Sequence, residues 1–146
     1  MLWDLFETKA TSLGASVVHT SDVAGALPPL RSPAEVVAHA ELAIAETGSV
    51  LVSLPQPERA AALLAERLWI VVRAADIVAN LDQALTHVHT LIAAGRPYAT
   101  FMSGPSRTAD IERALTIGVH GPRALTIVVV EEARSRWSAP PETAPA

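Results

Sequence analysis

The chain has 146 residues, 50% of them hydrophobic, and a formal net charge of −4. A chain of this length can bury about two-thirds of its unfolded surface around one core, so a single domain accounts for it. The small acidic charge leaves no basic stripe and argues against nucleic acid as a ligand. The apolar residues occur in short runs, none near the ~18 residues of a membrane span, so we expect no membrane partner.

The absence of cysteine excludes disulfides, thiolate nucleophiles and cysteine-ligated zinc or iron–sulfur centres within these residues. Asp4 and Glu7 lie where a secretory signal has basic and then apolar residues, which predicts a cytoplasmic protein. His87 and His89 do not indicate a metal site, because helix positions two apart diverge by about 200°. We therefore expect this chain to bind neither a metal nor a cofactor, and we assign both histidines to the surface.

The first half of the chain alternates helical and extended patterns. The expected elements are a helix over residues 2–13, a strand over 16–20, a loop over 21–33, a helix over 33–40 and two extended runs on either side of a glycine corner at 46–49. The helix at 33–40 is predicted because Ser32 and Glu35 match a capping box, with Pro33 at the first helical position.

The second half repeats this alternation. The expected elements are a helix over residues 57–67, a strand over 68–72, a helix from 81 to 94 capped by Asn80, a strand over 98–102, a helix over 109–117 and a strand over 124–130. Strands alternating with helices predict an α/β domain with a mainly parallel sheet and helices on both faces. We place this single domain at residues 1–136, followed by a disordered tail rich in proline and alanine at residues 137–146.

The densest polar cluster is residues 103–112, SGPSRTADIE. It follows a predicted strand and opens a predicted helix, where ligands of open α/β sheets bind. Gly104 lets the backbone approach a ligand, and the hydroxyls and the Arg107 guanidinium suit a carboxylate or phosphate. Asp110 and Glu112 favour the helix dipole but repel an anion. The alternative is an ordinary capped helix with an Arg107–Asp110 ion pair on a solvated face.

Two further segments interrupt the apolar pattern. In residues 46–49, ETGS, Glu46 lies at a strand end beside a glycine. A carboxylate there can act as a general base or nucleophile, or simply face solvent in a turn. In residues 118–122, GVHGP, His120 lies between two glycines before the last strand. It can donate to an anion, act as acid or base, or bond to nearby backbone.

The segments AIAETGSVLV, SGPSRTADIERAL and GVHGPRALTIVVV together resemble the LUD-domain family, and within it the lactate utilization protein C group. The resemblance covers about residues 5–130. It implies a fold like that of the sugar-phosphate isomerases and coenzyme A transferases. It also implies a function in L-lactate oxidation beside iron–sulfur partner proteins, whose clusters would belong to those partners because this chain has no cysteine.

The resemblance also implies a set of site residues. Glu46 and His120 are the candidate catalytic residues. The ligand-binding candidates are Thr47, Gly48, Ser103, Gly104, Pro105, Ser106, Arg107, Thr108, Asp110, Glu112 and Gly121. We expect all three motifs on one rim of the sheet, around a shared pocket.

Two functions remain open at this point. The preferred hypothesis is a non-redox component or regulator of an iron–sulfur L-lactate oxidation system that binds a small carboxylate or phosphate. The alternative is a stand-alone enzyme that converts acyl or sugar-phosphate compounds and is related to the coenzyme A transferases. In that case Glu46 would be the nucleophile or base.

Overall fold

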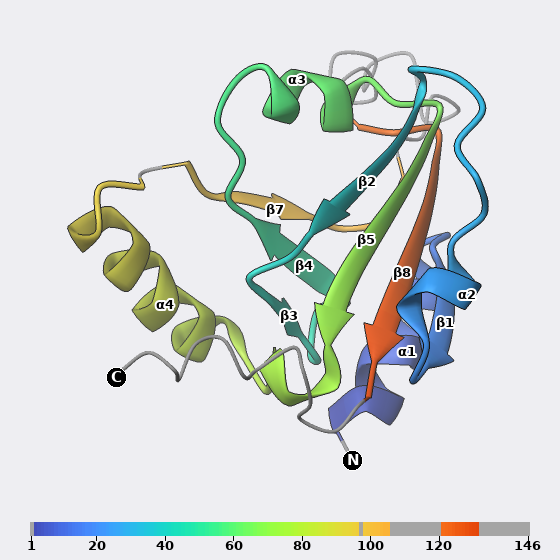
Figure 1. Cartoon of the computed structure of the whole chain (residues 1–146). Coiled ribbons are helices and arrows are strands. Elements are labelled where there is room, and N and C mark those ends of the chain that lie inside the picture. Colours follow the sequence, from blue (N-terminus) through green and yellow to red (C-terminus); the bar gives the residue numbers. More distant parts are fainter. Residues whose placement is uncertain (1, 97, 106–120, 132–146) are drawn as a thin grey trace, which may run out of the picture.

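The computed structural model describes residues 2–96, 98–105 and 121–131, and Figure 1 shows their arrangement. The helices are α1 (Leu2–Ser12), α2 (Val23–Ala26), α3 (Glu58–Leu63) and α4 (Leu81–Ala93), with a 3-10 turn η1 (Ala74–Asp76). The strands are β1 (Ser16–Thr20), β2 (Glu35–His39), β3 (Leu42–Ile44), β4 (Ser49–Val52), β5 (Arg67–Arg73), β6 (Ile77–Val78), β7 (Thr100–Met102) and β8 (Ala124–Val130). The helix predicted at 109–117 and the tail predicted at 137–146 lie outside the described residues.

Sheet A contains the four strands β1, β8, β5 and β2 in that order. All of its pairings are parallel. The central strands β5 and β8 run side by side (Figure 1) and are buried along most of their length. Their continuous apolar sequences are typical of strands covered on both faces. The structure therefore confirms the prediction of an α/β fold with a mainly parallel sheet.

Sheet B has the order β6, β3, β4 and β7. β4 pairs antiparallel with both β3 and β7, whereas β3 and β6 are parallel. The turn between β3 and β4 contains Gly48 with φ of 75°. The sequence indicated these two extended runs and the corner between them, but not that they belong to a second sheet.

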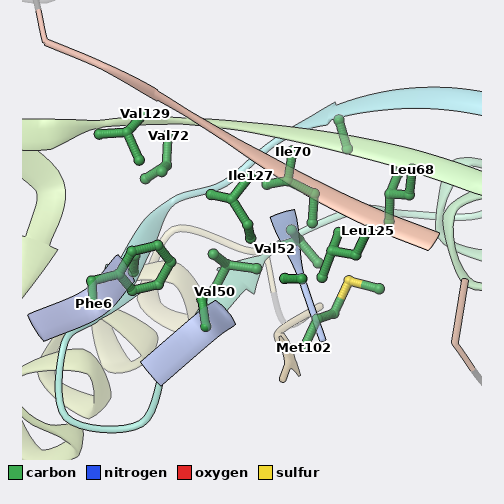
Figure 2. Packing of buried hydrophobic residues seen from close by; sticks show 14 of the residues in the cluster. Phe6, Val50, Val52, Leu68, Ile70, Val72, Met102, Leu125, Ile127 and Val129 are labelled. Atoms are coloured by element: carbon green, nitrogen blue, oxygen red, sulfur yellow. The ribbon is translucent and has the colours of Figure 1, made fainter. Parts of the chain in front are cut away.

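The main core lies between the two sheets and the helices beside them (Figure 2). Ile70 and Ile127 of sheet A face Val50 and Val52 of sheet B, and Phe6 of α1 closes the same cluster. Full burial of one such side chain stabilises the fold by about 1.5–3 kcal/mol. The apolar faces of α1, sheet A and sheet B therefore fix the position of the strand ends that carry the polar motifs.

Helices cover the remaining faces. Val23 and Ala26 of α2 pack on the other side of sheet A, against a cluster that includes Trp69 and Val128. On the outer face of sheet B, Ala84 and Leu91 of α4 pack against a cluster that includes β3 and β4 residues. Sheet A therefore has helices on both faces, as predicted.

The prediction of a helix at residues 33–40 was wrong, because Glu35–His39 forms strand β2. The capping-box residues do make local hydrogen bonds: Ser32 Oγ accepts from the Ala34 amide at 3.1 Å, and Glu35 Oε1 accepts from the Arg31 amide at 2.7 Å. These bonds close a turn, after which the chain pairs in parallel with β5. The β-branched pair Val36 and Val37 suits a strand.

Two other helices differ from the prediction. α2 lies within the predicted loop, where the Asp22 side chain caps it by accepting from the Gly25 amide at 3.2 Å. α3 ends at Leu63 instead of continuing to residue 67, because Arg67 already belongs to β5. The start of β5 thus sets the end of α3, whereas a local cap sets the start of α2.

The predicted α4 is confirmed, including its cap, since the Asn80 side chain accepts from the Gln83 amide at 3.1 Å. Of the four leucine and valine side chains that recur at helical spacing, Leu91 is buried and Val88 packs against the same cluster, whereas Leu81 and Leu85 are 43% and 40% exposed. The buried face also includes Ala84. The small Ala84 side chain lets the helix lie close to sheet B.

Candidate functional site

The first two polar motifs meet at one end of sheet B. In the antiparallel pair of β4 and β7, Val50 lies opposite Met102, so the first residue of β4 lies beside the residue that follows β7. Ser49 Oγ and Ser103 Oγ are 2.6 Å apart, and Thr47 Oγ1 donates to Ser49 Oγ at 3.0 Å. We call Thr47, Ser49 and Ser103 the hydroxyl cluster. It joins side chains that are far apart in the sequence.

Two glycines place the hydroxyl cluster against α1. Gly48 has φ of +75° and Gly104 has φ of +81°. A Cβ atom on Gly48 would lie 2.6 Å from the Ala10 amide nitrogen, and one on Gly104 would lie 2.6 Å from the Leu13 carbonyl oxygen. A side chain at Gly48 would require movement of the α1 backbone, and one at Gly104 would require movement of the backbone at Leu13, which follows α1. For Gly104, the sequence indicated close approach to a ligand, and the structure gives packing against Leu13 as a sufficient reason for the glycine.

Glu46 lies at the amino terminus of α4. Its side chain is exposed, and Oε2 accepts from the Leu81 amide at 3.4 Å, while the Glu46 amide donates to the Ala79 carbonyl at 3.2 Å. A carboxylate at this position is stabilised by the unpaired amides and the dipole of the helix. Within the described part of the chain, no hydrogen bond joins Glu46 to the hydroxyl cluster. A catalytic role for Glu46 stays a prediction.

The third motif enters sheet A at the amino ends of its strands. Gly121 precedes β8, and the Arg123 and Ala124 amides donate to the carbonyls of Ala65 and Glu66, just before β5. Gly121 therefore lies at the amino end of its strand, whereas ligands of open α/β sheets bind at the carboxyl ends. The predicted site residues Ser106, Arg107, Thr108, Asp110, Glu112 and His120 lie outside the described residues. The shared pocket stays a prediction.

Sequence reasoning missed Ser49 as a site residue. Its side chain is 5% exposed and lies between the hydroxyls of Thr47 and Ser103. The only available signal was its place in the ETGS segment, directly after the glycine. Nothing in the linear sequence shows that β4 pairs with β7, which is what brings Ser49 to Ser103.

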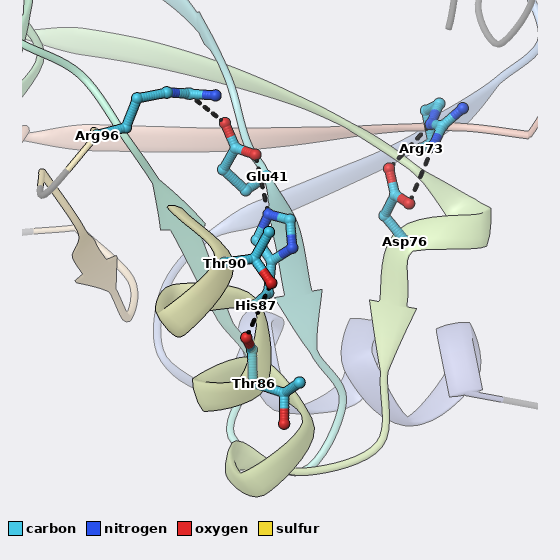
Figure 3. Close-up of polar contacts among 7 residues, drawn as sticks. All are labelled: Glu41, Arg73, Asp76, Thr86, His87, Thr90 and Arg96. Atoms are coloured by element: carbon cyan, nitrogen blue, oxygen red, sulfur yellow. Dashed lines mark hydrogen bonds and ion pairs between the residues drawn. The ribbon is translucent and has the colours of Figure 1, made fainter. Parts of the chain in front are cut away.

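A second polar group joins α4 to the segment before β3 (Figure 3). His87 Nε2 is 3.1 Å from Glu41 Oε1, and Arg96 Nη2 donates to Glu41 Oε2 at 2.7 Å. Burial raises the pKa of Glu41, but the hydrogen bonds and charges of His87 and Arg96 together outweigh burial and lower the pKa below its ordinary value. His87, which the sequence assigned to the surface, is therefore a half-buried partner of Glu41.

A cavity of about 360 Å³ lies beside this group, between β2, α3 and Arg96. Its size falls at the low end of small-molecule pockets. Its lining includes Ser53, whose buried hydroxyl has no hydrogen-bond partner among the described residues, and the carboxylate of Glu58. The sequence singled out none of these residues, because they come from separate elements and form no motif.

Two further contacts support the fold around sheet A. Arg73 binds Asp76 through two hydrogen bonds of 2.8 and 3.1 Å (Figure 3). His19 lies against the Trp3 ring at 3.9 Å between centroids, and its Nδ1 is 3.4 Å from Glu131 Oε2. Glu131 is far from His19 in the sequence and lies beside it only through the parallel pairing of β1 and β8.

Across residues 2–96, 98–105 and 121–131, no group of three or more histidine, aspartate or glutamate side chains could hold a metal ion. None of the helices in these ranges has the length and apolar character that a membrane span requires.

The comparison with known families identifies the domain. Residues 36–130 match the family profile of the LUD domain, a range that contains all three polar motifs. The chain belongs to the LUD-domain family. The match covers more than half of the chain and includes the hydroxyl cluster and both strands of sheet A that form its centre.

Curated relatives of this LUD-domain chain include two proteins named lactate utilization protein C. The one from Shouchella clausii is 34% identical over 99 residues, which are 66% of this chain and 43% of the relative. The one from Deinococcus radiodurans is 38% identical over 91 residues, which are 61% of this chain and 42% of the relative. The chain thus spans less than half the length of these two relatives.

A solved structure has the same fold. It is the crystal structure of a DUF162 family protein from Deinococcus radiodurans, with a TM-score of 0.66 and 25% sequence identity. The similarity covers 88% of this chain and 96% of that protein. The arrangement of the LUD domain described above is therefore shared over nearly the whole of that structure.

Proposed function

We propose that this LUD-domain chain is a non-redox component or regulator of an iron–sulfur L-lactate oxidation system. Its relatives are named lactate utilization protein C, which supports a place in lactate utilization. The chain has no cysteine to bind an iron–sulfur cluster. In this proposal the clusters belong to cytoplasmic partner proteins, and this chain supplies binding or regulation instead of electron transfer.

The proposed ligand is a small carboxylate or phosphate held at the hydroxyl cluster. The 2.6 Å contact between Ser49 and Ser103 carries this proposal, because it joins two motifs that the sequence singled out separately. Hydroxyl donors suit the oxygen atoms of such an anion. Arg107 follows Ser103 closely in the sequence and would supply the positive charge.

The alternative is a stand-alone enzyme that converts acyl or sugar-phosphate compounds and is related to the coenzyme A transferases. The exposed carboxylate of Glu46 favours this alternative, because it lies at a strand end and its hydrogen bond to the Leu81 amide is long at 3.4 Å. Such a group can act as a nucleophile or base. The fold relationship to those enzymes is an analogy, and fold alone does not establish a reaction.

Purification from cells grown on L-lactate separates the two functions. The tagged chain is expected to bring down partner proteins that contain iron and acid-labile sulfide, and to have no acyl-transfer or isomerase turnover alone. A chain that purifies without iron-containing partners, and that turns over acyl-CoA or sugar phosphates, would support the enzyme. A Glu46→Gln variant then tests the role of that carboxylate.

A further inference from the structure

The hydroxyl cluster has a direction that follows from its hydrogen bonds. Thr47 Oγ1 accepts from the Ser49 amide at 3.3 Å and donates its own proton to Ser49 Oγ at 3.0 Å. Ser49 Oγ and Ser103 Oγ are 2.6 Å apart, and on distance alone either could be the donor. A hydroxyl has one proton to donate and two lone pairs to accept with. The donor in this last contact therefore depends on where the Ser49 proton can go.

Burial of Ser49 settles that question. Ser49 is 5% exposed, which leaves its hydroxyl little access to water as an acceptor for its proton. Thr47 already donates to Ser49, which leaves Ser103 Oγ as the acceptor among the described residues. If Ser103 donated instead, Ser49 would accept twice and its buried proton would have no acceptor among the described residues, which is costly. The chain of donors therefore runs from Thr47 through Ser49 to Ser103.

The last hydroxyl in this series of hydrogen bonds, that of Ser103, faces outward. Ser103 is exposed, and within the part of the chain that the structure describes its Oγ has Ser49 Oγ as its hydrogen-bond partner. Because Ser103 accepts from Ser49, its own proton is available to an outside acceptor. Each donor in such a chain polarises the next, which strengthens the final O–H group as a donor.

We infer that Ser49 is a positioning residue that orients Ser103 as a hydrogen-bond donor, so that the site selects a ligand through an oxyanion held by the Ser103 hydroxyl. The inference rests on the proposed function for the presence of a ligand. It adds Ser49 to the site residues, and it adds a preference of the site for ligands with hydrogen-bond acceptor groups. A carboxylate or phosphate oxygen satisfies this donor, whereas an ammonium group or a neutral amide nitrogen does not.

Binding measurements test the preference. The probes are L-lactate and inorganic phosphate as oxyanions, and L-lactamide as the neutral counterpart of lactate, titrated into the full chain by calorimetry. Ser103→Ala is expected to lower the affinity for the oxyanions by about 10- to 100-fold, since it removes a hydrogen bond to a charged group. Ser49→Ala, which leaves Ser103 in place but without its orienting donor, is expected to lower it by about 3- to 10-fold.

The matched control is Ser53→Ala. Ser53 is also a buried serine, 7% exposed, and its hydroxyl has no hydrogen-bond partner among the described residues. This variant is expected to bind the probes like the unmodified chain, with each variant checked for folding by circular dichroism. Equal affinity of the Ser49→Ala variant and the unmodified chain for both oxyanions would overturn the inference, and so would binding of L-lactamide as tight as that of L-lactate.

A measurement without any ligand separates failure of this inference from failure of the proposed function. In nuclear magnetic resonance spectra recorded in mixed H₂O and D₂O, a slowly exchanging Ser49 hydroxyl splits the Ser49 Cβ signal into protonated and deuterated forms. That splitting at Ser49, with fast exchange at Ser103, supports the direction inferred here. Protection of the Ser103 hydroxyl instead would overturn it, even if the oxyanions bind. If the unmodified chain binds none of the probes, both the proposed oxyanion ligand and its selection by Ser103 are overturned.

Discussion

The contact between the ETGS turn and α1 makes Gly48 a sensitive position. Replacing Gly48 by alanine has two costs. The backbone at φ of +75° is unfavourable for a residue with a side chain, by about 1–2 kcal/mol. The new Cβ would also lie 2.6 Å from the Ala10 amide nitrogen and 2.8 Å from the Lys9 carbonyl carbon, so the backbone of α1 must move. Overpacking of this kind costs about 1–3 kcal/mol.

Gly95 provides a control for the first of these costs. It has φ of +82°, and a Cβ atom there would meet no atom of the described residues within 4 Å. Gly95→Ala is therefore expected to lower the free energy of unfolding by about 1–2 kcal/mol, and Gly48→Ala by about 2–5 kcal/mol in total. The difference between the two variants measures the contact with α1.

Urea denaturation followed by circular dichroism gives both values. The slope of the unfolding free energy against urea is expected to be the same in both variants and the unmodified chain, because the surface exposed on unfolding does not change. Equal losses of stability in Gly48→Ala and Gly95→Ala would refute the close packing of the turn against α1. The hydroxyl cluster would then lack the rigid support described above.

Three further predictions concern the core, the Glu41 group and the ligand. Ile127→Ala is expected to lower the free energy of unfolding by about 2–5 kcal/mol, because Ile127 is 1% exposed in the core. The control Leu64→Ala, at a side chain that is 72% exposed, should change it by about 0.5 kcal/mol or less. Similar losses of stability in the two variants, measured by urea titration, would contradict this core. Glu41 has a lowered pKa in the folded state, so its contribution to stability is present above the ordinary carboxyl pKa of about 4.3 and is lost as the pH falls through its lower folded value. Glu41→Gln should flatten the fall in melting temperature over that acidic range, and an unchanged pH profile would count against the contacts with His87 and Arg96. Arg107→Lys is expected to weaken binding of phosphate and L-lactate without changing the melting temperature, because lysine cannot reproduce a bidentate contact; unchanged binding would support the alternative interpretation of this motif as an ordinary capped helix on a solvated face.

Features set by neighbouring residues could be predicted from the sequence. The continuous apolar runs predicted β5 and β8, and Asn80 predicted the start of α4. The error at β2 has the same origin, because Ser32 and Glu35 have the sequence spacing of a capping box, but their side chains accept from the amides of Ala34 and Arg31 instead. Pairing with β5 determines the conformation of the residues that follow. Local hydrogen bonds alone do not show whether the residues that follow form a helix or a strand.

Features set by strand pairing could not be predicted. Sheet B depends on which strands are neighbours, and short apolar runs carry no information about their partners. The same limit applies to the site: the sequence indicated the ETGS and SGPS segments as polar, but Ser49 joins Ser103 only through the register of β4 and β7. The segment that contains Gly121 was predicted to lie on the same rim, but it enters sheet A at the amino ends of the strands.

A ligand site at the hydroxyl cluster is tested most directly by mapping where L-lactate and phosphate bind. In titrations of the ¹⁵N-labelled chain followed by nuclear magnetic resonance, we expect saturable shifts centred on the amides of Thr47, Ser49 and Ser103. Shifts centred instead on Ser53 and Arg96, which line the cavity beside β2, would place the ligand elsewhere. That result, or the absence of any saturable shift, would contradict a ligand site at the hydroxyl cluster.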